Sequence, residues 1–123
     1  MKLNHTIVYC SDRTRSSNFL SDILGREAPG RYGPFNVVTL DNDVSLDYLE
    51  VDRPIAEQHL AFLISEAEFD QVFARMKAQG VSFWADPGRT RAGSINHNDG
   101  GRGVYFNDPD GHLFEVLTVP YGG

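Results

Sequence analysis

The sequence has one cysteine, no long hydrophobic run and no cluster of basic residues. A lone Cys10 excludes an internal disulfide and fits a reducing compartment, so we expect a cytoplasmic protein. The hydrophobic runs are far shorter than the ~20 residues that cross a bilayer, so we expect no membrane role. Because 17 Asp and Glu residues outnumber 11 Lys and Arg residues, the net charge is −6, and we expect no nucleic-acid partner.

The 123 residues are enough for one domain with a substantial core, and a hydrophobic content of 41% is ordinary for a globular protein. We therefore expect a single domain over residues 1–123.

The first half of the chain reads as a strand, a helix and two further strands. Residues 3–10 are rich in β-branched and aromatic types and predict a strand. Ser11 and Asp12 are good N-caps for a helix that Gly25 ends. A loop follows, and residues 35–40 and 44–51 predict a hairpin.

The second half repeats this order after a connector at about residues 52–58. Residues 59–64 predict a strand, Ser65 and Glu68 form a capping box for a helix that Gly80 ends, and residues 81–84 predict a short strand. A polar loop at 86–102 leads to a closing hairpin. The chain is thus expected to hold two modules, about 1–51 and about 59–123, in the α+β class.

Glu115 is the most informative single residue of this hairpin. Both faces of its strand are apolar, with Phe114 and Val116 on one face and Leu113 and Leu117 beside Glu115 on the other, so the strand should be buried. A buried carboxylate loses its hydration, which costs several kcal/mol unless a cation, hydrogen-bond donors or a metal compensates.

Two histidines stand at matching places in the repeat. His5 and His59 lie in the first strands of the two modules, and Asp47 and Glu115 lie in later strands. Pairing of the modules would bring them together, and two imidazoles with one carboxylate can bind a divalent transition metal. The alternatives are an exposed His5 near the terminus, a His59 bonded to backbone, and a Glu115 paired with an arginine such as Arg102.

The loop before the last hairpin supplies further candidates. His97 could act as a general acid or base, or belong to a solvated loop. We expect Asn96, Arg102 and Tyr105 to contact substrate, with Arg102 and Tyr105 entering a strand that faces the cavity or its rim. His112, at the turn, is expected to be exposed.

The chain resembles the vicinal oxygen chelate superfamily of glyoxalase I, bleomycin-resistance proteins, fosfomycin-resistance thiol transferases and extradiol dioxygenases. The resemblance rests on Leu3-Asn4-His5, on His59, and on Asp108-Pro109-Asp110-Gly111-His112 followed by Glu115. It implies two βαβββ modules that form an open U-shaped mixed β-sheet barrel with helices outside. It also implies one divalent metal ion (Zn, Ni, Mn or Fe(II)) on His5, His59 and Glu115.

The resemblance further implies a homodimer in which His5 comes from one subunit and His59 with Glu115 from the other. Asp47 stands where glyoxalase I carries a glutamate, so it is a candidate fourth ligand, base or hydrogen-bonding group. We expect a metal-dependent enzyme that chelates a small oxygenated substrate, with a glyoxalase-like lyase or isomerase as the leading reading. The alternatives are a single-domain ring-cleavage dioxygenase and a metal-free drug-binding protein of the bleomycin-resistance type.

Overall fold

The computed structural model describes residues 1–121, and these form two compact units. Unit 1 comprises Met1–Ala56 together with the turn Asp108–Asp110. Unit 2 comprises Glu57–Asn107 and the described residues from Gly111 onward. Each unit is described by itself below.

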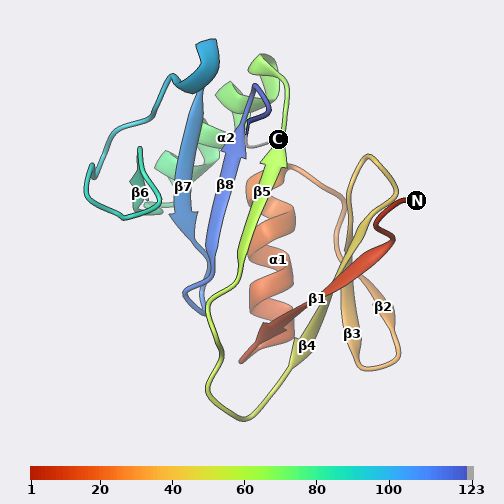
Figure 1. The fold of residues 1–123 in the computed structure, drawn as a ribbon. Coiled ribbons are helices and arrows are strands. Elements are labelled where there is room, and N and C mark those ends of the chain that lie inside the picture. The colour runs from red at the N-terminus through yellow and green to blue at the C-terminus, as the bar shows by residue number, and fades with distance from the viewer. Residues whose placement is uncertain (122–123) are drawn as a thin grey trace. The chain divides into compact units, whose positions relative to one another are not determined.

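Unit 1 is a βαβββ module (Figure 1). Its sheet has the strand order β1-β4-β3-β2, in which β1 runs parallel to β4 and the other neighbours are antiparallel. The elements are β1 (His5–Cys10), α1 (Arg13–Leu24), β2 (Gly30–Tyr32), β3 (Phe35–Thr39) and β4 (Ser45–Glu50).

Unit 2 repeats the same topology with the strand order β5-β8-β7-β6, in which β5 runs parallel to β8. Within residues 1–121, neither this unit nor unit 1 has a helix long and apolar enough to cross a membrane. The elements are β5 (His59–Leu63), α2 (Glu66–Ala78), β6 (Phe83–Trp84), the 3₁₀ turn η1 (Asn98–Gly100), β7 (Gly103–Asn107) and β8 (Leu113–Leu117).

The predicted α+β class with two βαβββ modules is therefore confirmed. The residue pattern, which predicts a loop here, does not locate β2, because its three residues are all exposed and carry no alternating pattern. This strand exists through pairing with β3, where Arg31 lies opposite Asn36. The strand expected at 81–84 is shorter than predicted and spans only Phe83–Trp84.

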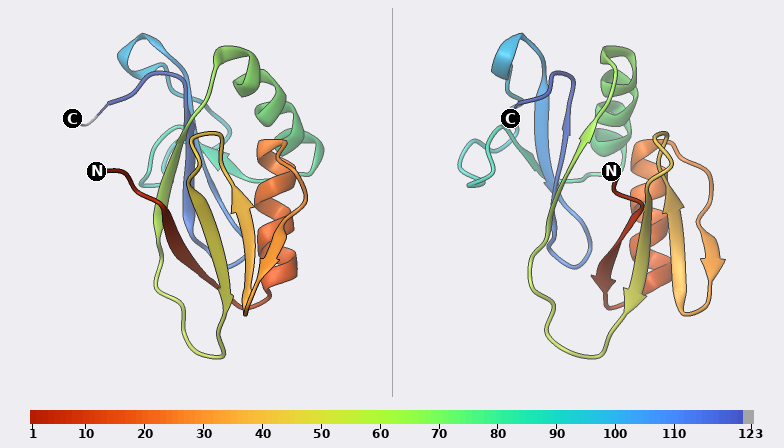
Figure 2. Two further views of the ribbon diagram at one scale, coloured as in Figure 1. Left: turned by 90° about the vertical axis from the view of Figure 1, so that its right-hand side faces the viewer. Right: turned by 45° about the vertical axis from the view of Figure 1, so that its right-hand side comes forward.

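Helix α1 covers one face of the unit 1 sheet (Figure 2). Asp12 caps the helix by accepting a hydrogen bond from the Arg15 amide, and Gly25 ends it in the left-handed region at φ 67°. The side chains that the sheet turns toward the helix are at most 2% exposed: Val8, Cys10, Val38, Leu46 and Tyr48. The opposite face, which carries His5, Ile7 and Asp47, is only partly covered.

Helix α2 packs on the unit 2 sheet through its aromatic residues. The expected capping box is present, with the Ser65 hydroxyl accepting from the Glu68 amide and the Glu68 carboxylate accepting from the Ser65 amide. Phe69 is fully buried, and the Phe73 ring lies 5.0 Å from the Phe83 ring in an edge-to-face contact.

The turn Asp108–Asp110 belongs to unit 1, where Asp110 binds the segment at the start of α1. Its carboxylate accepts hydrogen bonds from the Ser11 amide (3.2 Å), the Ser11 hydroxyl (2.6 Å) and the Ser16 hydroxyl (2.9 Å). Burial raises the pKa of Asp110, but the hydrogen bonds from Ser11 and Ser16 outweigh it and hold the pKa below its ordinary value.

Candidate metal centre

Glu115 lies in β8, between β5 and β7, and is 1% exposed. The expected burial of this carboxylate is therefore confirmed. The Tyr121 hydroxyl lies 2.9 Å from each carboxylate oxygen, and the Tyr105 hydroxyl lies 3.1 Å from that of Tyr121. Tyr121 was not predicted, because its place six residues after Glu115 follows no strand or helix pattern.

His59 lies at the start of the neighbouring strand β5, with its ring toward Glu115. Its Nδ1 is 2.9 Å from the carbonyl oxygen of Leu113. Because a carbonyl oxygen only accepts, Nδ1 carries the proton and the lone pair is on Nε2. This Nε2 lies 3.4 Å from Glu115 Oε1, which is longer than a charge-assisted hydrogen bond of about 2.7–2.9 Å.

The pair fits two ligands of one ion. Ligands about 2.1 Å from a metal at octahedral or tetrahedral angles lie roughly 3.0–3.4 Å apart. The separation of 3.4 Å between His59 Nε2 and Glu115 Oε1 matches this range. The backbone bond at Nδ1 is also the usual support of a metal-binding histidine.

Tyr105 contacts His59 and lies beside Glu115. Its ring stacks on His59, with centroids 6.2 Å apart, and it lies opposite Glu115 in the β7–β8 register. Burial, then the hydrogen bond to Tyr121 and the Glu115 charge, raise the pKa of Tyr105. Tyr105 therefore stays a neutral phenol beside the carboxylate.

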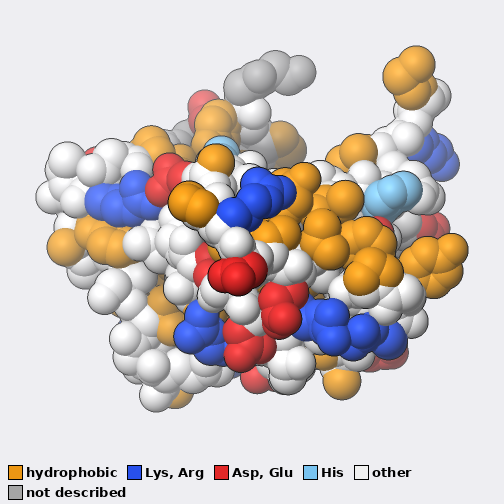
Figure 3. Space-filling view, turned by 90° about the horizontal axis from the view of Figure 1, so that it is seen from below, with side chains coloured by type: hydrophobic (Ala, Val, Ile, Leu, Met, Phe, Trp, Pro, Cys, Tyr) orange, Lys and Arg blue, Asp and Glu red, His pale blue; other side chains and the backbone are white. Residues whose placement is uncertain are grey.

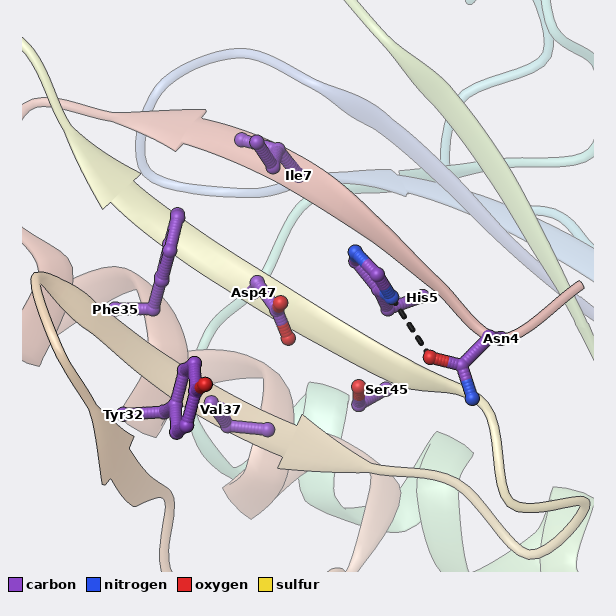
Figure 4. Close-up of a pocket in the computed structure, with 8 residues that line it drawn as sticks. All are labelled: Asn4, His5, Ile7, Tyr32, Phe35, Val37, Ser45 and Asp47. Carbon is purple, nitrogen blue, oxygen red and sulfur yellow. Dashed lines mark hydrogen bonds between the residues drawn. The ribbon is translucent and has the colours of Figure 1, made fainter.

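In unit 1, His5 has the same kind of support. Its Nδ1 lies 2.8 Å from the side-chain oxygen of Asn4, which leaves the Nε2 lone pair available (Figure 4). His5 borders a pocket of about 460 Å³. The pocket has polar residues at one end and an apolar wall, and its lining is Asn4, His5, Ser45, Asp47, Ile7, Tyr32, Phe35 and Val37.

Asp47 contributes a buried oxygen to this pocket. Among the described residues, its Oδ1 has no hydrogen-bond partner although water does not reach it. A buried carboxylate oxygen without a donor is costly, and a cation would remove that cost. The residues present in unit 1 thus also suit a metal, through His5 and Asp47.

The two modules place their histidine and acid in the same register. His5 begins β1, and two residues later Ile7 lies opposite Asp47 in the parallel strand β4. His59 begins β5, and two residues later Ala61 lies opposite Glu115 in the parallel strand β8. The repeat inferred from the sequence is therefore a repeat of the histidine–acid pairs as well as of the fold.

His5 and Asp47 belong to unit 1, whereas His59 and Glu115 belong to unit 2. Over residues 1–121, no group of three or more His, Cys, Asp or Glu side chains is close enough to hold a metal. A three-ligand set of His5, His59 and Glu115 accordingly stays a prediction.

Arg102 was expected on a strand facing the cavity or its rim, but the structure places its side chain against α2. Arg102 and Tyr105 are three residues apart in extended chain, so their side chains leave opposite faces. Arg102 packs over the Phe69 ring of α2 and forms ion pairs with Glu66 (2.7 Å) and Asp70 (2.9 Å). Because Arg102 is bound to these two acids, it is not the partner of Glu115. More generally, basic and acidic side chains are interspersed on the face of the molecule drawn in Figure 3.

Asn96 is also placed differently from the expectation of a substrate contact. It is 6% exposed, and its amide donates to the carbonyl of Ala85 while its oxygen accepts from the amide of Asn98. Its side chain lies so close to Gly103 that a Cβ there would come within 2.9 Å of it. Asn96 therefore holds the loop onto β7.

His97 is exposed and His112 is buried. His97 is exposed just before η1, so its role as an acid or base stays a prediction. His112 is fully buried, contrary to expectation, because its Nδ1 accepts a hydrogen bond from the Gln58 amide and its ring stacks on Phe114.

Burial and then the charge of Asp110 raise the pKa of Cys10 to about 12, so this thiol is not a nucleophile at neutral pH.

Comparison with known proteins identifies the family. Residues 2–116 match the model of the glyoxalase/bleomycin resistance protein/dioxygenase superfamily, and the chain belongs to this superfamily. A metallothiol transferase FosB from Lysinibacillus sphaericus is 31% identical over 94% of this chain and 81% of its own length. A glutathione transferase FosA from Serratia marcescens is 29% identical over 93% of this chain and 78% of its own length.

Among solved structures, the oxidase ChaP-H1 is 57% identical, with a TM-score of 0.97 over 100% of this chain and 99% of its own. A mutant of the fosfomycin resistance protein FosX from Listeria monocytogenes, complexed with Mn(II), shares the fold at 23% identity and a TM-score of 0.74, over 97% of this chain and 93% of its own. Family membership and the metallothiol transferase relative support a metal-dependent enzyme of the vicinal oxygen chelate type, without choosing its reaction.

Proposed function

We propose that the protein is a metal-dependent oxidase that acts on a small oxygenated molecule with O2 as the electron acceptor. The observation that carries this proposal is the pair of His59 Nε2 and Glu115 Oε1, 3.4 Å apart beside a phenol pair. With one further histidine it makes a set of two histidines and one carboxylate, which is typical of non-haem Fe(II) oxygenases. The similarity to the oxidase ChaP-H1 at 57% identity favours the same reaction class.

We propose His5 as the further histidine, contributed by a second copy of the chain, as the resemblance implies. The Nε2 lone pair of His5 is available, because Nδ1 is bonded to Asn4. When bound, a divalent ion would polarise adjacent substrate oxygens and, as Fe(II), would react with O2. Asp47 is proposed to bind or orient the substrate or to act as a fourth ligand, and His97 to transfer a proton.

The second candidate is the glyoxalase-like lyase or isomerase expected from the sequence, or thiol transfer of the kind named for FosA and FosB. The matching histidine–acid pairs of the two modules support these reactions as well as they support oxidation, because such enzymes need only a Lewis acid and a base. The similarity to an oxidase at much higher identity supports oxidation as the first proposal.

The test begins with metal analysis of protein purified without chelator. We expect about one equivalent of Fe, Mn, Ni or Zn per chain in the wild type and none in His59→Ala. His97→Ala serves as the matched histidine variant, since it should keep the metal and lose turnover. If the wild-type protein has no measurable affinity for any of the four ions, the enzyme proposal is wrong, and the remaining alternative is a metal-free small-molecule binding protein.

The reaction is then chosen by substrate. We expect oxygen uptake with dihydroxyarene probes in the Fe(II) form. Loss of a hemithioacetal in the Ni or Zn form without oxygen uptake would instead establish the lyase, and consumption of glutathione with fosfomycin would establish thiol transfer.

A further inference from the structure

The chain segment after β8 reaches back to the buried carboxylate. Tyr121 is 50% exposed, yet its hydroxyl lies 2.9 Å from both oxygens of Glu115, which is 1% exposed. The segment is thus anchored at this point by a polar contact, while much of the phenol ring stays in contact with solvent.

The direction of the hydrogen bonds follows from the chemistry of the groups. A carboxylate only accepts, so the Tyr121 hydroxyl donates its one proton to Glu115. The Tyr121 oxygen then accepts from the Tyr105 hydroxyl, 3.1 Å away. The donors form a chain from Tyr105 to Tyr121 to Glu115, in which each bond polarises the next.

This chain partly restrains the orientation of the carboxylate. One proton shared between two oxygens can move entirely to Oε2 when Oε1 is used by another group. Oε1 is the oxygen that faces His59 Nε2, at 3.4 Å. Tyr121 can therefore keep its hydrogen bond through Oε2 while Oε1 binds an ion together with His59.

We propose that Tyr121 is a positioning residue that holds Glu115 in its metal-binding orientation, an inference that rests on the proposed metal site. Tyr121 touches the carboxylate and acts through it. Second partners of metal ligands usually strengthen binding by about 10–100-fold. We expect the Tyr121 hydroxyl to strengthen it by about 10-fold, because a ligand held by one shared proton is only partly restrained.

The test measures Mn(II) binding to the full chain by calorimetry in wild type, Tyr121→Phe, Tyr121→Ala and Tyr48→Phe. We expect Tyr121→Phe and Tyr121→Ala to bind Mn(II) similarly, each about 10-fold more weakly than wild type. Tyr48→Phe is the matched control, because it removes a buried phenol hydroxyl of unit 1 that has no hydrogen-bond partner among the described residues, and it should bind Mn(II) as tightly as wild type.

The comparison of phenylalanine with alanine separates the hydroxyl from the ring. If Tyr121→Phe binds Mn(II) as tightly as wild type, or more tightly, the inference is wrong, and a loss seen only in Tyr121→Ala would assign a packing role. Thermal unfolding without metal checks that each variant folds. A wild type that does not bind Mn(II), Fe(II), Ni(II) or Zn(II) would refute the proposed function instead.

Discussion

Glu115→Gln should make the metal-free protein more stable and the metal-loaded protein less stable than wild type. The buried carboxylate costs several kcal/mol of desolvation, and hydrogen bonds to a charged group return about 1.5–3 kcal/mol. An amide of the same shape carries no charge, can accept from Tyr121 and can donate to the His59 Nε2 lone pair. We expect a gain of about 1 kcal/mol, or roughly 3–5 °C in Tm for a chain of this size.

Metal should reverse that order. At a concentration of about 100 times its Kd, a bound ion stabilises the wild type by about 2.7 kcal/mol. If the substitution weakens affinity about 100-fold, the same concentration stabilises the variant by only about 0.4 kcal/mol. The wild type would then be more stable than Glu115→Gln by about 1 kcal/mol.

The assay is thermal unfolding with chelator and with each of Zn(II), Ni(II), Mn(II) and Fe(II), the last without oxygen. Glu27→Gln is the matched control, because Glu27 is exposed and should respond to neither change. The reasoning would be refuted if Glu115→Gln unfolded at a lower temperature than wild type in chelator, which would make the carboxylate a structural requirement. Equal shifts with metal in both proteins would refute its role as a ligand.

Two predictions concern the framework that carries the site. Asp110 has a pKa lowered in the folded state, so its contribution to stability is complete above about pH 5 and is lost as the pH falls through the ordinary value of about 3.9 toward the folded pKa. Wild type should therefore lose more stability than Asp110→Asn between pH 5 and 3 in urea unfolding, and parallel losses would show that the bonds from Ser11 and Ser16 contribute nothing. Gly103→Ala should destabilise the protein by about 1–3 kcal/mol, since the new Cβ would meet the Asn96 side chain at 2.9 Å. The same assay tests it, and a double variant Gly103→Ala with Asn96→Ala should lose less than the sum of the two single losses.

Local signals predicted the fold well because they are short-range. The Ser65–Glu68 capping box and the helix caps at Asp12 and Gly25 depend only on neighbouring residues. The burial of Glu115 followed from apolar residues on both faces of one strand, which needs no knowledge of the partners.

The failures concern where a polar side chain finds its partner. Asn96 and Arg102 were expected to contact substrate, because polar residues in a glycine-rich loop resemble a binding loop. Their partners are instead the distant Ala85 carbonyl and the acids of α2. His112 was misplaced for the same reason, since the Gln58 amide that binds it comes from the connector. Strand and turn patterns do not contain such pairings.

The two acids share a register but differ in their surroundings. Asp47 and Glu115 occupy equivalent positions opposite Ile7 and Ala61. Glu115 is one methylene longer and has Tyr121 as a donor, whereas Asp47 Oδ1 lacks a partner among the described residues. A hydrogen-bond donor offsets part of the desolvation cost of a buried carboxylate, whereas a buried oxygen without a donor carries that cost in full. Glu115 therefore has a protein donor that orients it, whereas Asp47 presents a buried oxygen without a described donor at the pocket of unit 1.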